Sequence, residues 1–389
     1  MNARTEHASK HASKHASIRR PAVFLIPALL AALAALPGCD LFLRRASLEP
    51  NPTDMARRVI LRTAVDHRHP PPFDWGEGVL ISGMIRAGKA AGEATAGVFA
   101  RTWANHWRTA GIQAVLEEKG YCGRWGPAFA LVQLFEGTED QLYLDLADQV
   151  GDFIDTRATR TADGAYGHWR GNRQLWIDTL YMAAPVQAAL SRTAPRYDHL
   201  DEAVRQVRIF ARRLQDPRTG LFRHMFDEDC NLGTDDFWAR GNGWAAMSFI
   251  EVLRRLDRDS PAWIELRQGL RTLLDGLAAA QDLRTGLWHT VLDRPETYLE
   301  TSASAMFLFA FIEGERLGLI ERTHGDLIRR AWTGIASQVD DGGRVFGVSG
   351  DTAPTDLAGY SDVLQGEYPW GTGAFLLAAG ALIDWKAGR

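Results

Sequence analysis

Three segments of the chain bring ionisable and aromatic residues close together: residues 164–182, 220–244 and 286–304. In the first, Asp178 stands between Trp176 and the apolar run TLYMAAPVQAAL, so we expect it at the start of a helix with few polar neighbours. Loss of water raises the pKa of a carboxyl group and keeps a proton available for general-acid catalysis, whereas helix capping lowers that pKa. Asp178 is therefore the candidate for proton transfer, and the alternative is that it only caps its helix.

Histidines accompany these segments. His168 lies ten residues before Asp178 across an expected loop, which favours a site over a simple helix cap. His224 follows the corresponding loop of the second segment. His289 in the third segment is interpreted as a supporting or structural residue.

Arg240 and Trp244 lie four residues apart in the second segment, so a helix places the cation and the aromatic ring on one face. A guanidinium group can bind a sugar carboxylate through two parallel hydrogen bonds. The alternative is a structural arginine that pairs with Asp235 or Asp236.

Many tryptophans stand beside Gly, His or Arg at expected loop or helix-start positions. They are Trp75, Trp125, Trp169, Trp176, Trp238, Trp244, Trp288 and Trp370. Aromatic faces suit the C–H faces of sugar rings, and neighbouring polar groups can bind hydroxyls and carboxylates. For any one of these residues, packing in the core is the alternative.

The elements that would hold these residues are helical. Apolar residues of the mature chain recur at helical spacing, and strand-like alternation is scarce. A glycine-containing loop recurs at Gly164, Gly220, Gly286 and Gly342, at intervals of 56, 66 and 56 residues. Each interval fits one helical hairpin, and six hairpins would take about 340 residues. We predict an all-α fold, an (α/α)6 barrel with the loops after Gly164, Gly220 and Gly286 at one mouth, and the alternative is an open solenoid.

The N-terminus is typical of an exported lipoprotein. A basic stretch is followed by 16 uncharged residues, 21–36, which suit a signal peptide better than a membrane span. The run ends in Leu-Pro-Gly-Cys at Cys39, which resembles a bacterial lipobox, and the alternative is a chance cysteine after an ordinary signal. We expect a signal peptide over 1–38, a lipidated N-terminus and linker over 39–55, and the barrel over 56–389. The protein would then be anchored by lipid on the periplasmic side of a bacterial membrane.

Composition and spacing exclude several classes of partner. The net charge is -4 and no basic block follows the signal, which argues against nucleic acid. Metal-ligand spacing and a phosphate-binding loop are missing, so we expect neither a metal nor another cofactor. Cys122 and Cys230 are predicted either to pair or to remain thiols.

Several strings of the chain match a known family. QLWIDTLYMAAPVQAAL, FWARGNGWAAMSFIEVL and YPWGTGAFLLAAGAL, with others between about residues 60 and 385, resemble the unsaturated glucuronyl and rhamnogalacturonyl hydrolases, glycoside hydrolase families 88 and 105. The resemblance implies an (α/α)6 barrel and an acid that protonates C4 of a 4,5-unsaturated uronic acid before water adds at C5. It also implies that Asp178 is this acid and then the base. The remaining residues that it places around the substrate are His168, Trp176, His224, Arg240 and Trp244.

The chain departs from this family at one position. The family has a second aspartate just before an inner helix, and Gly123 stands there in this chain. The change implies a shifted substrate, a replacement carboxylate such as Glu77, or lost activity.

The leading functional hypothesis is a hydrolase that removes the unsaturated uronic acid from pectin-derived, rhamnogalacturonan-type oligosaccharides. The alternatives are a hydrolase of other uronosides, a non-catalytic sugar-binding lipoprotein, or a sugar epimerase or polysaccharide lyase on the same barrel. Asp178 argues against a pure binding protein, which has no need of a positioned acid.

Overall fold

The computed structural model describes residues 49–67, 69–193 and 198–388. Pro50–Arg389 form one compact unit. Cys39 and the predicted signal segment 1–38 lie outside the described residues, so the lipidation site stays a prediction. Within the described ranges, no helix is both long and apolar enough to cross a membrane.

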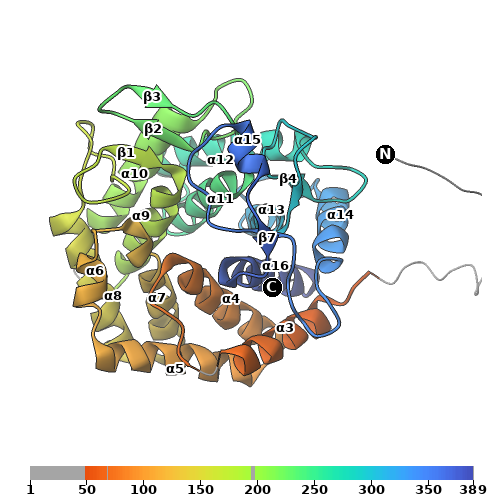
Figure 1. Ribbon diagram of the computed structural model, residues 1–389. Coiled ribbons are helices and arrows are strands. Elements are labelled where there is room, and N and C mark those ends of the chain that lie inside the picture. The colour runs from red at the N-terminus through yellow and green to blue at the C-terminus, as the bar shows by residue number, and fades with distance from the viewer. Residues whose placement is uncertain (1–48, 68, 194–197, 389) are drawn as a thin grey trace, which may run out of the picture. The chain divides into compact units, whose positions relative to one another are not determined.

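Long helices form two concentric layers (Figure 1). The inner layer consists of α4 (Trp75–Ala91), α7 (Pro127–Thr138), α9 (Ile177–Leu190), α11 (Ala239–Leu253), α13 (Thr301–Arg316) and α16 (Pro369–Lys386). The outer layer consists of α5 (Ala94–Ala110), α8 (Gln141–Arg157), α10 (Asp198–Leu214), α12 (Pro261–Ala279), α14 (Gly325–Ala336) and α3 (Pro52–Asp66). Short helices α6 (Gln113–Glu117), η2 (Cys122–Arg124) and α15 (Leu357–Ser361) lie in the connections.

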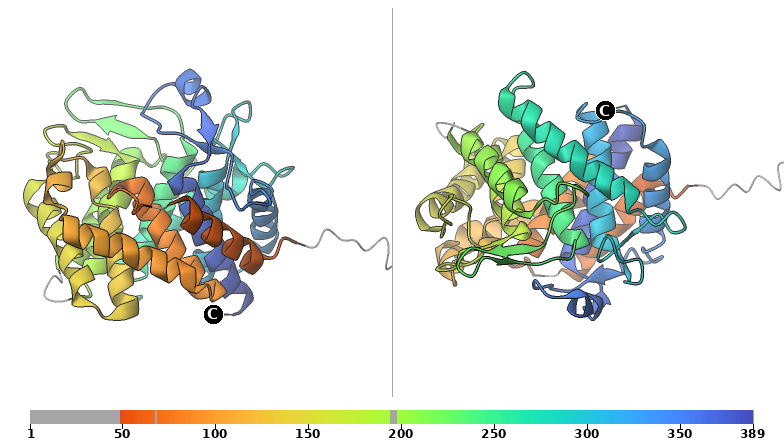
Figure 2. Two further views of the ribbon diagram at one scale, coloured as in Figure 1. Left: turned by 60° about the horizontal axis from the view of Figure 1, so that its bottom comes forward. Right: turned by 90° about the horizontal axis from the view of Figure 1, so that it is seen from above.

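The inner helices close into a ring. Each packs against the next one along the chain, and α16 packs against α4. The sixth hairpin pairs the two ends of the barrel sequence, because the first helix, α3, covers the last, α16 (Figure 2, left). The predicted (α/α)6 barrel is confirmed, and the open solenoid is wrong.

The barrel begins earlier than predicted. Helix α3 starts at Pro52, inside the segment 39–55 that was expected to be a linker. The Asn51 side chain accepts hydrogen bonds from the backbone N–H groups of Thr53 and Asp54, and Pro52 occupies the first turn. Asn-Pro is a strong helix-start signal, and it corrects this boundary.

Burial separates the two layers as their sequences require. Every residue of α11 is buried, because its apolar and small residues face neighbours on all sides. Outer helix α10 buries one face, which includes Val204, Val207 and Phe210, and exposes its aspartates and arginines.

The repeated loops lie at one end of the ring, which we call the mouth. Gly164, Gly220 and Gly286 have positive φ angles of 93°, 74° and 78°, and their loops lead to the N-terminal ends of α9, α11 and α13. The single mouth that was predicted for these loops is therefore confirmed. The opposite end, where the inner helices finish, is called the floor.

Short antiparallel strands brace the mouth (Figure 1). Strands β1 (Gln174–Trp176), β2 (Met225–Asp227) and β3 (Leu232–Gly233) form one sheet. β4 (Trp288–His289) pairs with β5 (Leu299–Glu300), and β6 (Val348–Ser349) pairs with β7 (Gln365–Gly366). Trp176 is opposite Met225, and this register brings the residues just after β1 beside those just before β2.

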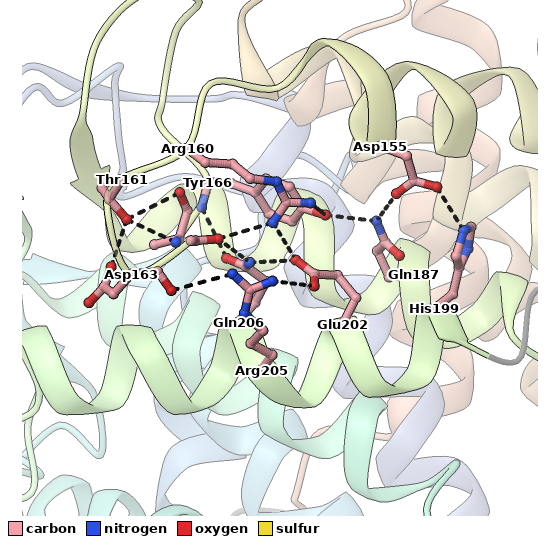
Figure 3. Close-up of polar contacts among 12 residues, drawn as sticks. Asp155, Arg160, Thr161, Asp163, Tyr166, Gln187, His199, Glu202, Arg205 and Gln206 are labelled. Atoms are coloured by element: carbon pink, nitrogen blue, oxygen red, sulfur yellow. Dashed lines mark hydrogen bonds and ion pairs between the residues drawn. The ribbon is translucent and has the colours of Figure 1, made fainter.

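A partly buried polar network fixes the loop that precedes β1 (Figure 3). Arg160 donates to Glu202 at 2.6 Å and to the Tyr166 hydroxyl at 3.0 Å. Gln187 donates to the same hydroxyl at 3.0 Å and to Asp155 at 3.1 Å. The loop is thereby tied to α8, α9 and α10, which limits its freedom ahead of the candidate site.

Candidate active site

A cavity of about 340 Å³ opens at the mouth. Residues from the starts of α4, α9 and α11, from η2 and from the loop after β6 line it. Its carboxylates are Asp74, Asp178 and Asp351, and its aromatic residues are Trp75, Tyr121, Trp169, Trp176 and Trp238. Ring faces beside several carboxylates form a surface suited to a sugar.

The predicted site residues occupy different positions around this cavity. Asp178, His168, Trp176 and Arg240 line it. His224 lies behind Asp178 and contacts it. Trp244 is not part of the lining. It is fully buried, stacked on Tyr181 with ring centroids 4.7 Å apart, because the helical face that it shares with Arg240 continues into the core.

Asp178 and His224 form a pair at the base of the cavity. Asp178 lies in the first turn of α9 with its side chain 20% exposed. Its Oδ2 lies 3.3 Å from Nε2 of His224, which is fully buried. The other imidazole nitrogen, Nδ1, lies 2.8 Å from the hydroxyl of Tyr360 in α15. The N–H of Thr355 points to the same hydroxyl oxygen at 3.5 Å, so the hydroxyl proton is directed to His224 Nδ1.

The contacts from Tyr360 through His224 to Asp178 determine the protonation states of His224 and Asp178. Burial lowers the pKa of His224, so a neutral imidazole carries its proton on Nε2 and faces Asp178 with it. Burial by itself raises the pKa of Asp178, but its interactions with His224, and the nearby His168 and Arg240, outweigh burial and leave the pKa below its ordinary value. The expected rise in this pKa is therefore wrong for the free protein, because the sequence did not reveal the His224 contact.

His168 is held by its neighbours on three sides. Its ring stacks on Trp176 with centroids 4.1 Å apart, and Trp169 meets its edge. Nδ1 lies 2.9 Å from the Thr179 hydroxyl and 3.3 Å from Sγ of Cys122. Burial lowers the pKa of His168 to about 3, so the ring is neutral at physiological pH.

The guanidinium group of Arg240 donates hydrogen bonds to the protein, so its terminal nitrogens are not free for a ligand. One terminal nitrogen donates to the carbonyl of Ser349 at 2.9 Å, and the other donates to the carbonyl of Gly350 at 2.8 Å and to Thr352 Oγ1 at 3.1 Å. The pairing with Asp235 or Asp236 that was considered does not occur. Arg240 instead holds the loop that brings Asp351 into the cavity. The predicted bidentate hydrogen bonding of Arg240 to a substrate carboxylate is therefore wrong for this conformation.

The family's missing aspartate has a steric explanation. Gly123 is buried in η2, and a Cβ at this position would collide with the ring of Tyr121. Tyr121 therefore occupies the space that a longer side chain would need. It lines the cavity and stacks on Trp169 with centroids 5.9 Å apart.

Asp74 supplies another carboxylate close to this position. It caps α4 and lies 2.6 Å from Arg124, the residue that follows Gly123. Burial raises its pKa, and Arg124 opposes part of that rise. Glu77, which was proposed as a replacement, is on the next part of α4 but does not line the cavity.

Sequence reasoning missed Asp74, Tyr121, Asp351 and Tyr360. The Asp-Trp pair at the start of α4 was a detectable helix-start signal for Asp74. Tyr360 and Asp351 lie in a long connection with no local pattern that marks them. The two thiols also differ: Cys122 is buried in the site and Cys230 is exposed, and each is free.

Comparison with known proteins agrees with this geometry. The profile of Glycosyl Hydrolase Family 88 matches residues 53–384. The chain is 29% identical over 341 residues to an unsaturated rhamnogalacturonyl hydrolase of Bacillus subtilis, covering 84% of this chain and 94% of the relative. It is 26% identical to an unsaturated 3S-rhamnoglycuronyl hydrolase of Formosa agariphila, covering 86% and 91%.

A solved structure shares the fold. It comes from Salmonella enterica and is described as a possible member of the GH105 family, with a TM-score of 0.75 at 24% identity and coverage of 94% of this chain and 96% of that one. The family match covers nearly all of the barrel that holds Asp178 and its neighbours. The chain therefore belongs to Glycosyl Hydrolase Family 88.

Proposed function

We propose that the protein removes a 4,5-unsaturated uronic acid from the non-reducing end of an oligosaccharide. The main support is the position of Asp178. This carboxylate lies at the start of an inner helix, lines an aromatic cavity and contacts a neutral histidine. A protein that only bound sugars would not need this positioned acid and base.

Proton transfer begins when the substrate arrives. The free protein holds Asp178 as a carboxylate, since its pKa lies below the ordinary value. A uronate placed beside it adds a second negative charge, which raises the pKa of Asp178 and favours uptake of a proton. Asp178 then gives this proton to C4 of the double bond.

Water completes the reaction. As the C4–H bond forms, positive charge develops at C5, and a water molecule adds there while its proton returns to the Asp178 carboxylate. The C5–O5 bond of the hemiketal then breaks as the proton of the new hydroxyl passes to O5, which leaves a ketone at C5 and a hemiacetal at C1. The hemiacetal collapses to an aldehyde, the bond from C1 to the neighbouring sugar breaks, and the O5 proton passes to the oxygen of the released sugar. Nε2 of His224 lies 3.3 Å from Asp178 Oδ2, and this contact stabilises the ionised form of Asp178 between the two transfers.

Electrostatics favour a neutral sugar next to the uronate. Asp351 is exposed in the cavity and has no ion pair within the described residues, while Arg124 is paired with Asp74 and the terminal nitrogens of Arg240 are occupied. A sulfate group next to Asp351 would therefore meet a carboxylate whose charge is not compensated. This supports rhamnogalacturonan-type oligosaccharides over the sulfated rhamnose in the name of the Formosa relative.

The decisive experiment offers three lyase digests to the mature protein: rhamnogalacturonan, a polysaccharide with 3-sulfated rhamnose, and hyaluronan. Loss of absorbance from the unsaturated bond reports turnover. We expect the highest kcat/KM on the rhamnogalacturonan digest. Faster consumption of the sulfated digest would replace the substrate assignment, and no consumption of any digest with measurable binding would favour the sugar-binding alternative.

We also propose that Cys39 is the lipidated N-terminus and tethers the barrel on the periplasmic side of a bacterial membrane. The support is the uncharged run that ends in Leu-Pro-Gly-Cys. Intact mass of membrane-extracted protein tests it. A mature chain that starts elsewhere, or lacks acyl mass, would reject the proposal.

A further inference from the structure

The imidazole of His168 meets a threonine and a cysteine at a single nitrogen. Nδ1 lies 2.9 Å from Thr179 Oγ1 and 3.3 Å from Cys122 Sγ, and these two atoms lie 3.4 Å from each other. Thr179 and Cys122 are fully buried, and His168 is nearly so. The three groups therefore have to satisfy one another or remain without partners.

The direction of these hydrogen bonds follows from counting protons. Among the described residues, the Thr179 hydroxyl has only the imidazole nitrogen and the sulfur within reach, and the nitrogen is the stronger acceptor. If Nδ1 carried the proton, the buried hydroxyl could donate only to sulfur. The favoured arrangement has Thr179 donating to Nδ1, with the thiol contributing a weaker contact.

We propose that Thr179 is a positioning residue that fixes His168 in the Nε2–H tautomer, so that a neutral imidazole donates a hydrogen bond into the substrate cavity. Nδ1 is occupied, and Nε2 makes no hydrogen bond to the described residues of the barrel. Stacking on Trp176 holds the plane of the ring, and Thr179 sets which nitrogen bears hydrogen.

This assignment gives His168 a task different from that of Asp178. Burial keeps the imidazole uncharged, so it does not exchange protons with substrate near neutral pH. It binds an acceptor oxygen of the uronic acid, either the carboxylate or a hydroxyl. Because Thr179 follows Asp178 directly in α9, one helix turn places the acid and selects the tautomer of its neighbour.

The test combines nitrogen NMR with kinetics on the mature full-length protein labelled with 15N-histidine. The His168 signals are identified by their loss in His168→Gln. We expect the Nε2–H pattern in the native protein, unchanged between pH 5 and 8. An Nδ1–H pattern or a charged ring in this range would overturn the proposal, whether or not the enzymatic function holds.

Substitutions at Thr179 separate tautomer control from simple packing. Thr179→Val keeps the shape and removes the hydroxyl, so we expect the Nδ1–H form to appear and kcat/KM to fall about tenfold. Thr179→Ser restores the donor and should recover both the spectrum and most of the activity. Thr63→Val is the matched control, since Thr63 is another buried threonine whose hydroxyl donates to the carbonyl of Val59 in α3.

The kcat/KM values of the threonine variants test the role of the Thr179 hydroxyl. Thr179→Val with a native tautomer, or with native kcat/KM, would show that the hydroxyl does not position His168. A change in Thr63→Val of the same size would assign the effect to packing. Native NMR behaviour together with absent turnover would reject the proposed function and leave the tautomer assignment intact.

Discussion

The mouth and the floor of the barrel differ in the partners that they give to a buried carboxylate. At the floor, Glu313 is fully buried and accepts hydrogen bonds from Arg86 at 2.9 Å, Arg254 at 2.8 Å and Arg316 at 2.7 Å. At the mouth, Asp178 forms no ion pair with a guanidinium group of the described residues, and its charged contact is His224 at 3.3 Å. The inner layer therefore carries a compensated carboxylate near the end of α13 and a carboxylate without an arginine partner at the start of α9.

The difference follows from helix polarity and from function. Arginines suit the C-terminal ends of the inner helices, where the backbone carbonyls and the dipole attract positive charge. At the N-terminal ends the partial positive charge of the backbone supports carboxylates, as at Asp178, which has no arginine partner, and at Asp74, which also pairs with Arg124. A site that has to bind a ligand keeps incompletely satisfied groups, and Asp178 Oδ2 and His224 Nε2 are buried atoms of this kind at the mouth.

Removing the carboxylate at the mouth should have the largest effect. Asp178→Asn keeps the shape and removes the proton carrier, so we expect kcat to fall by about 10² to 10⁴-fold. Stability should change little, because no side chain caps the start of α9 and the amide therefore removes no capping hydrogen bond. The measurement is turnover of the preferred unsaturated oligosaccharide, with thermal unfolding as the check on folding.

Asp140→Asn provides the control for this prediction. Asp140 caps outer helix α8 through the N–H of Leu142, away from the cavity lining. Both variants exchange one helix-start aspartate for its amide. Near-normal turnover in Asp178→Asn, or an equal loss in Asp140→Asn, would contradict the assignment of Asp178.

The same exchange at the floor should affect stability instead. Glu313→Gln leaves three arginines facing a neutral amide, and we expect a loss of about 3 kcal/mol in the free energy of unfolding. Urea titration measures the loss, and kcat at 25 °C should stay near native in the folded fraction. Glu265→Gln is the matched control, because the Arg208–Glu265 pair is exposed and worth at most about 1 kcal/mol.

The contrast also explains what the sequence could and could not predict. The barrel was predictable because the inner helices are apolar nearly all round and the Gly164-type loops repeat at hairpin spacing. Asp178, His168 and Trp176 were predictable as a cluster because they lie within eleven residues and meet through one loop.

Partners that are distant in the chain were not predictable from local patterns. Arg240 binds the backbone carbonyls of Ser349 and Gly350. Every residue has a backbone carbonyl, so the sequence does not mark these two as acceptors. Tyr360 lies 136 residues beyond the histidine that it orients. The sequence also does not show why position 123 needs a glycine, since this depends on where the ring of Tyr121 lies in the fold.

A smaller effect is expected from Tyr360, which orients the histidine at the mouth. Tyr360→Phe removes the hydroxyl that donates to Nδ1 of His224 and leaves the ring in place. Loss of one such hydrogen bond corresponds to about a three- to tenfold decrease in kcat. Tyr166→Phe is the control, because its buried hydroxyl serves the loop network of Figure 3 and not His224. Equal kcat values in the two variants would remove Tyr360 from the proton-transfer site.

The smallest effect concerns the pH dependence of stability at the mouth. Burial raises the pKa of Glu77 to about 7, and its neighbour Asp74 adds to the rise, whereas Arg124 opposes it. Arginines outweigh burial at Glu313 and lower its pKa. The two glutamates should therefore give opposite slopes of stability against pH.

The sign follows from proton binding. The folded protein holds the Glu77 proton between pH 4.5 and about 7, where the unfolded chain has lost it, so this contribution is greatest at low pH and falls as pH rises to 7. Glu77→Gln stays neutral and removes the slope. We expect the Tm of Glu77→Gln, relative to the native protein, to be a few degrees higher at pH 8 than at pH 5, since partial exposure reduces the effect to about 1 kcal/mol. Glu265→Gln should show no such change, and parallel Tm curves for Glu77→Gln and the native protein would show that Glu77 is ionised at the mouth throughout this range.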